Sequence, residues 1–368
     1  MKKTVSILLV AILTLAVLAG CKKPVAETAP TSSADATPTI TEVPKTQEPV
    51  ETEEPEAPVT VAEQEGRYIG EGATNQVGNL TVKSEWLPMQ YAIWGGDRQS
   101  VYTAATKDKI YMLTGGLLSE FIVKDGILVL EKEYTDVVPR TERAEYRSLS
   151  ADKDGILYLA SGAHSDACAL QDGKEIAYNT ERARVSVLTM HPSGKWGISS
   201  WVDSSDLRKV TIADETFASE PFEELFTEMS FTNCVGISEK HIMIGGKSVE
   251  SENTAIFVYD LDGKLELTLG DVASGDGRLS NIECVLETKN GYVVAGGFGD
   301  FTFFDLEGNY ICKYSRDAMF GEGSFGTGFM DLSSLTLMPN GDILVGLAVS
   351  LEIDDKTGDM TLFLISGF

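Results

Sequence analysis

An all-β fold is what the sequence predicts for residues 66–368, and two observations predict it. The first is a recurring pattern of an apolar strand, a tight turn and a second apolar strand. The second is the near absence of helical periodicity between the copies of this pattern. Both indicate a repeated β-sheet unit rather than a mixed α/β domain.

The strand-turn-strand pattern occurs six times. Its copies lie at 101–116, 146–162, 185–201, 233–248, 282–298 and 332–350. Equivalent turn positions 39 to 51 residues apart are Lys109, Gly155, Gly194, Lys240, Gly291 and Gly341. A second hairpin turn follows four of the copies, at Asp125-Gly126, Asp172-Gly173, Asp262-Gly263 and Glu307-Gly308. Four strands in each repeat of this length predict a six-bladed β-propeller of four-stranded antiparallel blades.

The phrase Asp154 to Ala160, DGILYLA, resembles the blade signature of NHL and TolB-like propellers. The resemblance covers residues 100–368 and concerns structure, because glycine supplies the positive φ of the turn and the apolar run packs between blades. The segment 360–368 reaches the C-terminus and leaves the last blade one strand short, so we expect 79–87 to supply the missing strand and close the ring. A seventh blade from 66–100 and a β-sandwich are the alternatives.

The first 20 residues predict a lipoprotein signal peptide. Lys2 and Lys3 precede a thirteen-residue apolar run, which is too short for an ordinary membrane span. The run ends in Leu18-Ala19-Gly20-Cys21, which resembles the lipobox of bacterial lipoproteins. That resemblance implies that Cys21 is lipidated, by palmitate or another acyl chain, after cleavage. We therefore expect a mature protein tethered to the extracytoplasmic face of a cell membrane.

Residues 22–65 are rich in Pro, Thr and Glu and contain no aromatic residue, so with Cys21 they predict a disordered linker, 21–65. The whole chain has a net charge of -26, from 30 Lys and Arg against 56 Asp and Glu. Such a surface repels phosphate backbones, and we expect no nucleic-acid partner.

No residue set identifies a reaction. The three histidines have no metal-ligand spacing, and no GxSxG elbow is present, so we predict no catalytic residue, no metal site and no cofactor. Calcium at Asp354, Asp355 and Asp359 is the alternative to a polar hairpin. The string Gly321 to Gly326 matches G-x-G-x-x-G, but a glycine-aromatic loop between blades is the preferred interpretation.

Four cysteines follow Cys21: Cys168, Cys234, Cys284 and Cys312. An even number in an exported protein permits two disulfides, but the spacing gives no framework. Because Cys234 and Cys284 lie inside apolar inner-strand segments, we expect buried thiols.

Seven of the ten arginines lie in or just after the expected connections between blades. The five that we predict as ligand-binding are Arg143, Arg182, Arg184, Arg278 and Arg316. Converging guanidinium groups would bind an anion, whereas local pairing with acids such as Asp317 is the alternative.

These observations favour a membrane-anchored propeller that acts as a binding module for a cell-envelope protein, a glycan or a small anionic ligand, without enzymatic activity. The alternative is a hydrolase or lyase on the same scaffold, resembling the lactonases, with a metal at the channel mouth.

Overall fold

The computed structural model describes residues 60–61, 71–91, 100–114, 117–134, 146–161, 166–179, 187–202, 208–214, 219–221, 228–322, 329–350 and 359–368. All of them belong to one compact unit, Glu56–Phe368. The predicted signal peptide, Cys21 and the linker up to residue 59 lie outside the described residues. Among the described residues, no helix is long and apolar enough to cross a membrane.

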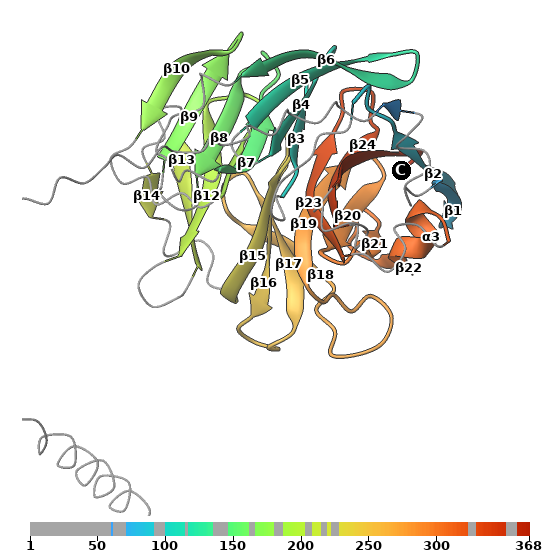
Figure 1. The fold of residues 1–368 in the computed structure, drawn as a ribbon. Coiled ribbons are helices and arrows are strands. Elements are labelled where there is room, and N and C mark those ends of the chain that lie inside the picture. Colours follow the sequence, from blue (N-terminus) through green and yellow to red (C-terminus); the bar gives the residue numbers. More distant parts are fainter. Residues whose placement is uncertain are drawn as a thin grey trace, which may run out of the picture. The chain divides into compact units, whose positions relative to one another are not determined.

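Five four-stranded antiparallel sheets form the blades of an all-β propeller (Figure 1). Blade 1 contains β3 (Tyr102–Ala105), β4 (Ile110–Thr114), β5 (Leu117–Lys124) and β6 (Ile127–Tyr134). Blade 2 contains β7 (Tyr146–Ala151), β8 (Leu157–Ser161), β9 (Asp166–Gln171) and β10 (Lys174–Asn179). Blade 3 contains β11 (Val187–Met190), β12 (Trp196–Val202), β13 (Arg208–Asp214) and β14 (Ser219–Pro221). Blade 4 contains β15 (Met229–Ile237), β16 (His241–Ser248), β17 (Thr254–Asp260) and β18 (Leu265–Leu269). Blade 5 contains β19 (Ile282–Thr288), β20 (Gly291–Gly296), β21 (Phe301–Phe304) and β22 (Tyr310–Tyr314).

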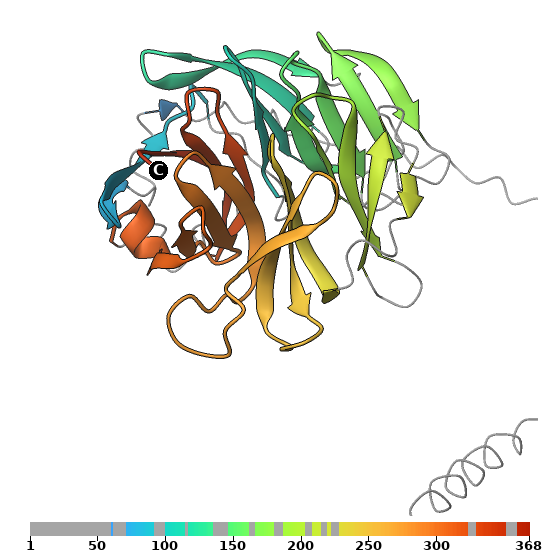
Figure 2. The same cartoon turned by 180° about the vertical axis from the view of Figure 1, so that it is seen from behind.

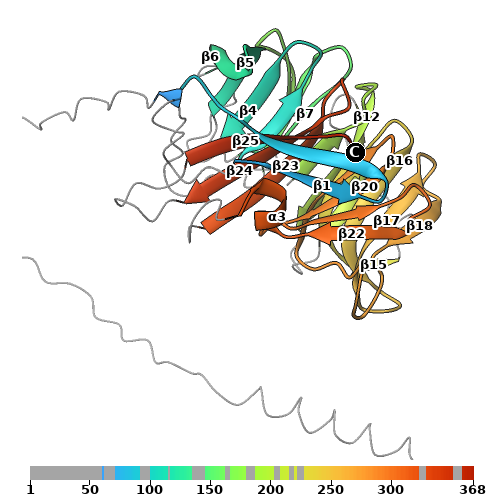
Figure 3. The ribbon, with the colours of Figure 1, turned by 90° about the vertical axis from the view of Figure 1, so that its right-hand side faces the viewer.

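The remaining sheet, which we call the closing sheet, has five strands in the order β1-β2-β25-β24-β23. These strands are β1 (Ala73–Val77), β2 (Leu80–Leu87), β23 (Phe329–Leu337), β24 (Ile343–Ser350) and β25 (Asp359–Ser366). Figure 3 shows the N-terminal strands, in blue, beside the C-terminal strands, in red. The prediction that 79–87 completes the last blade is confirmed by the pairing of β2 with β25. The prediction of four strands is wrong for this sheet, because the chain doubles back and adds β1 outside β2.

All six predicted strand-turn-strand copies form the first two strands of a sheet. The first strand of each sheet contacts the first strand of the next, and β23 of the closing sheet contacts both β19 and β3. Gly155 and Gly194 take positive φ values of 81° and 70° at their turns, as the blade signature predicts.

Each interface between neighbouring sheets has its own apolar core. Within the described part of the chain, buried side chains form six clusters. For example, Leu113 of blade 1 packs with Leu159 of blade 2, whereas Phe301 of blade 5 packs with Phe363 of the closing sheet. This is the arrangement expected when the apolar run of each blade fills the space beside its neighbour.

A short helix that the sequence did not predict, α3 (Arg316–Phe320), covers the closing sheet (Figure 3). The Asn75 amide of β1 donates to the Ala318 carbonyl at 2.9 Å, and the Ser84 hydroxyl of β2 donates to the Met319 carbonyl. The exit from β2 then contacts the edge of blade 1, where the Gln90 amide donates to the Leu128 carbonyl at 2.7 Å. One N-terminal segment therefore joins the last sheet to the first.

Candidate functional site

The strand order defines two ends of each sheet. In an antiparallel meander, the turn from second to third strand and the connection to the next blade lie at the same end. We call this end the loop face, and we call the opposite end, with the first-to-second and third-to-fourth turns, the turn face. Figures 1 and 2 show the β16–β17 turn and the long β18–β19 connection projecting from the same end of blade 4.

Two of the five predicted ligand-binding arginines lie among the described residues. Arg278 is exposed in the β18–β19 connection. Arg316 begins α3, and its Nε donates to Asp317 Oδ1 at 3.2 Å. This contact is the local pairing with an acid that was the alternative to anion binding for Arg316. Arg143, Arg182 and Arg184 lie outside the described residues, so a shared anion site stays a prediction.

Four inner strands share an irregularity that the sequence analysis missed. In β7, β15, β19 and β23 the pairing with the second strand shifts by one residue. The residues skipped by the register are Arg147, Asn233, Glu283 and Ser333, each seven or eight positions before the turn residue of its hairpin. Bulges of this kind redirect a side chain and are frequent beside binding sites. All four residues are polar, in strands that are otherwise largely apolar.

The residues after the bulges have a structural role. Ser148 and Ser334 reach the inner strand of the next sheet, where Ser148 Oγ accepts from the Leu188 amide at 3.0 Å and Ser334 Oγ donates to the Val101 carbonyl at 2.8 Å. Cys234 and Cys284 occupy the equivalent position in blades 4 and 5. A polar residue followed by Ser or Cys and then by Leu or Val is thus the sequence signal for the bulge.

At the loop-face end of blade 5, Gly297 brings two inner strands together. Its amide donates to the Asn281 carbonyl at 3.1 Å, and its carbonyl accepts from the Leu332 amide of β23 at 3.3 Å. A Cβ built on Gly297 would lie 3.0 Å from the Asn281 side-chain nitrogen and 3.7 Å from Glu283 Oε2. The absence of a side chain therefore keeps the space between Asn281 and Glu283 open.

Asp331 and Ser333 lie on β23 on either side of Leu332, whose amide donates to the Gly297 carbonyl. Burial raises the pKa of Asp331, and the described residues include no cation paired with it. Ser333 is 9% exposed, and its hydroxyl has no hydrogen-bond partner among the described residues. By contrast, Asp300 in the same region pairs with Lys313 at 2.6 Å. Asp331 and Ser333 thus retain hydrogen-bonding capacity that Asp300 has already used.

Phe298 follows Gly297 and is 67% exposed, the largest exposed fraction among the described large hydrophobic residues. We define the mouth site as Asn281, Glu283, Gly297, Phe298, Asp331 and Ser333. It combines carboxylates, an amide, a hydroxyl and an exposed aromatic ring around a glycine, and this set of groups can bind a polar ligand.

The cysteines are not candidate nucleophiles. None of the four described cysteines is in a disulfide. The expectation of buried thiols is confirmed for Cys234, whereas Cys284 is only partly buried. Burial, followed by the neighbouring Cys234 and Glu283, raises the pKa of Cys284 well above its usual value. A thiol with a raised pKa contains little of the reactive thiolate.

A second polar cluster lies on the turn face between blades 4 and 5. His241 Nδ1 lies 2.9 Å from Glu287, and its Nε2 lies 3.1 Å from Glu266 Oε2. Ser238 Oγ also donates to Glu287. Serine, histidine and glutamate are the side chains of a hydrolase triad, but here the serine contacts the acid and not the imidazole. The arrangement joins two blades and does not activate Ser238.

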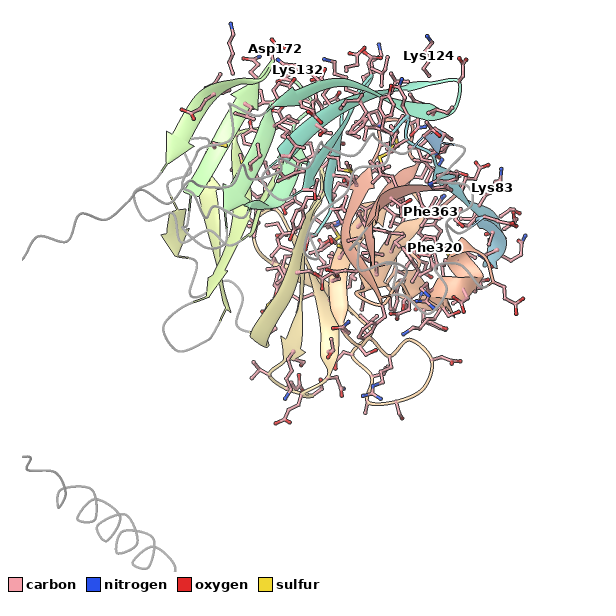
Figure 4. The ribbon with its side chains drawn as sticks, in the orientation of Figure 1. Lys83, Lys124, Lys132, Asp172, Phe320 and Phe363 are labelled. Atoms are coloured by element: carbon pink, nitrogen blue, oxygen red, sulfur yellow. The ribbon has the colours of Figure 1, made fainter. Side chains whose placement is uncertain are left out.

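Other polar groups are paired within a blade or with the neighbouring blade. Asp152 accepts from the Tyr158 hydroxyl at 3.0 Å, beside the Gly194 turn of blade 3. In blade 1, the buried Glu120 accepts from Tyr134 and pairs with Lys109. Figure 4 shows Lys132 of blade 1 near Asp172 of blade 2. Such satisfied networks support the ring and leave the mouth site as the candidate for binding.

The described residues contain no group of three or more His, Cys, Asp or Glu side chains that could hold a metal ion. Asp354 and Asp355, the calcium alternative from the sequence, lie outside the described residues, as does most of the Gly321–Gly326 string.

No protein-family model and no curated protein matches the chain. Solved structures do match it. A calcium-binding protein, regucalcin, from Agrobacterium tumefaciens is 13% identical over 76% of this chain and 96% of its own, with a TM-score of 0.48. The hydrazine synthase of Kuenenia stuttgartiensis is 11% identical over 70% of this chain and 77% of its own, with a TM-score of 0.45. The computationally designed Ika8 protein is 13% identical over 78% of this chain and 82% of its own, with a TM-score of 0.40. The class of this protein, a β-propeller, is defined by its own sheets.

Proposed function

We propose that the protein is a lipid-anchored, extracytoplasmic propeller that binds a cell-envelope ligand through its loop face. The observation that carries this proposal is the register shift at one equivalent position in four inner strands, each with a polar residue. A structural bulge needs no particular side chain, whereas Arg147, Asn233, Glu283 and Ser333 supply different hydrogen-bonding groups. Their variety favours recognition of a ligand with several polar groups.

The finer description of the fold belongs to the same proposal. We count the closing sheet as the sixth blade, because β23 contacts both β19 and β3 as an inner strand would. The blade signature at Asp154 to Ala160 supports an NHL or TolB-like propeller. The anchor rests on the Leu18-Ala19-Gly20-Cys21 lipobox, with residues 22–65 as the spacer between membrane and propeller.

The anchor has a direct test. Replacing Cys21 by Ala removes the thiol that would receive the diacylglyceryl group, so the Cys21→Ala variant should lose palmitate labelling and should either leave the membrane fraction or retain its signal peptide. The measurement is metabolic labelling with radioactive palmitate, followed by membrane fractionation, with Cys312→Ala as the matched control. Labelling that persists in Cys21→Ala would disprove lipidation at this position.

The binding face is tested by capture from envelope extract. The full chain is immobilised in detergent, and bound proteins and glycans are identified by mass spectrometry. Phe298→Ala combined with Glu283→Gln alters the loop face of blade 5, whereas Leu306→Ala combined with Glu307→Gln makes similar changes at exposed residues on its turn face.

We expect the loop-face pair to reduce the captured ligand at least about tenfold, since hot-spot losses commonly exceed 1.4 kcal/mol. The turn-face pair should capture as much as the unmodified chain. Equal capture by both variants, or loss only in the turn-face pair, would rule out the loop face as the binding surface.

A further inference from the structure

The β18–β19 connection joins two neighbouring turns of the loop face. Near its start, Asp271 Oδ1 accepts hydrogen bonds from the side chains of Ser251 and Asn253 in the β16–β17 turn. At its end, the Asn281 carbonyl accepts from the amide of Gly297 in the β20–β21 turn at 3.1 Å. The connection therefore links the loop-face turns of blades 4 and 5 into one continuous surface, which projects from this end of blade 4 (Figure 2).

The connection is also anchored in the propeller. Leu279 is 4% exposed and belongs to the apolar core between blades 4 and 5. A Cβ built on Gly270 would lie 2.4 Å from the Leu279 side chain, and one built on Gly277 would lie 3.2 Å from Tyr310. These close contacts limit the conformations of the connection, and a surface that is ordered before binding loses less conformational entropy when a partner binds.

Three large apolar side chains are exposed on this joined surface. Val249 is 57% exposed, Val272 is 38% exposed and Phe298 is 67% exposed. Each stands within two positions of a residue that joins the loops. Single exposed apolar residues are ordinary on a protein surface, whereas a group of them on connected loops marks an interaction site. We call these three residues the apolar ridge.

The loops that carry the apolar ridge on blade 4 are acidic. Residues 249–253 and 270–281 contain four acidic residues against one basic residue, Arg278. Neither Glu250 nor Asp276 has an ion-pair partner among the described residues. A partner with positive charge would therefore be attracted to this surface, and an anionic partner would be repelled.

We propose that the apolar ridge docks a segment of a partner protein that presents apolar side chains next to Lys or Arg. The proposal rests on the function proposed above and names the class of partner at the loop face. Phe298 also belongs to the mouth site, so the docking surface extends from the mouth site onto blade 4. The apolar side chains supply affinity, and the acids supply orientation and partner choice.

Two other occupants fit less well. A second copy of this chain that docked through the same ridge would bring like charges together, because a two-fold interface places the same patch on both sides. A neutral glycan would stack on Phe298 but would gain nothing from the charge of the surrounding acids. Both occupants are outcomes of the following experiment.

The test selects twelve-residue peptides from a random phage-display library on the immobilised full chain in detergent. We expect the selected peptides to be enriched in apolar and basic residues and depleted of Asp and Glu. The affinity of one selected peptide is then measured by fluorescence anisotropy. The triple variant Val249→Ser, Val272→Ser, Phe298→Ser should bind it at least about tenfold more weakly, as expected for the centre of an interface.

The matched control replaces three exposed leucines of the turn face: Leu261→Ser, Leu306→Ser, Leu337→Ser. This variant should bind the peptide as well as the unmodified chain, and both triple variants should keep its melting temperature because all six side chains are exposed. Glu250→Gln combined with Asp276→Asn should weaken binding about two- to fivefold and reduce its dependence on salt.

Selection of acidic peptides, of peptides that bind both triple variants equally, or of none at all would overturn the proposal. Binding of N-acetylglucosamine tetramer through Phe298 without any selected peptide would overturn it in favour of a glycan. A dimer in sedimentation that the ridge variant converts to a monomer would overturn it in favour of a second copy. If the loop-face pair loses envelope capture but no peptide depends on the ridge, the docking proposal fails while the proposed function stands. If peptides depend on the ridge but envelope capture ignores the loop face, the proposed function fails while the docking surface stands.

Discussion

Deletion of residues 71–91 should leave a chain that no longer unfolds cooperatively. The deletion removes β1 and β2 and leaves the edge of β25 unpaired where it now bonds to Lys83–Leu87. It also removes Val77, Val82 and Leu87, which are 1%, 0% and 4% exposed. Burial of each such side chain contributes about 1.5–3 kcal/mol, so the loss approaches the whole stability of an ordinary domain, about 5–15 kcal/mol.

The measurement is thermal unfolding followed by circular dichroism, together with the soluble yield of the deleted chain. A peptide of residues 71–91 added in trans should restore a cooperative transition, because it supplies the same strands without a covalent link. The double variant Lys83→Ser, Glu85→Ser is the control, since this exposed pair contributes at most about 1 kcal/mol. A deleted chain that melts at the original temperature would show that these strands do not hold the ring closed.

The repeated hairpins could be predicted from the sequence because their determinants are local. Each copy contains a turn residue between two apolar runs, and Gly155 occupies the positive-φ position that its turn requires. The role of 79–87 was predictable for a different reason, since the last blade lacked a strand and this segment was the unassigned apolar one. Its pairing with β25 confirms that counting argument.

The parts that were missed depend on distant contacts. The β1 segment Ala73–Val77 is too polar to stand out as a strand, and it is fixed partly by Asn75 contacting Ala318, 243 residues away in the chain. The mouth site was missed for the same reason, because Gly297 of blade 5 contacts Leu332 of the closing sheet only when the ring brings the two sheets together. The arginines suggested a ligand site because seven of the ten lie in or just after the expected connections between blades. Arg316, however, pairs with its neighbour Asp317.

Replacement of Phe363 by Ala should be the most destabilising of the single substitutions considered for this protein. Phe363 on β25 is fully buried, pairs with Trp86 of β2 and Val345 of β24, and lies 4.6 Å from Phe320 of α3 between ring centroids. Figure 4 shows the two phenylalanines side by side. The substitution leaves a cavity where the N-terminal strand, the C-terminal strand and α3 meet, and Phe→Ala changes of this kind cost about 3–5 kcal/mol.

For a domain of this size that cost corresponds to a fall in Tm of about 6–20 °C, measured by calorimetry. Phe298→Ala is the matched control, because the same residue type is removed from an exposed position and stability should change by no more than about 0.5 kcal/mol. A similar fall in Tm for both variants would contradict the assignment of Phe363 to the core that closes the ring. A fall confined to Phe363→Ala would also establish that loss of envelope capture in the Phe298→Ala, Glu283→Gln variant is not caused by unfolding at Phe298.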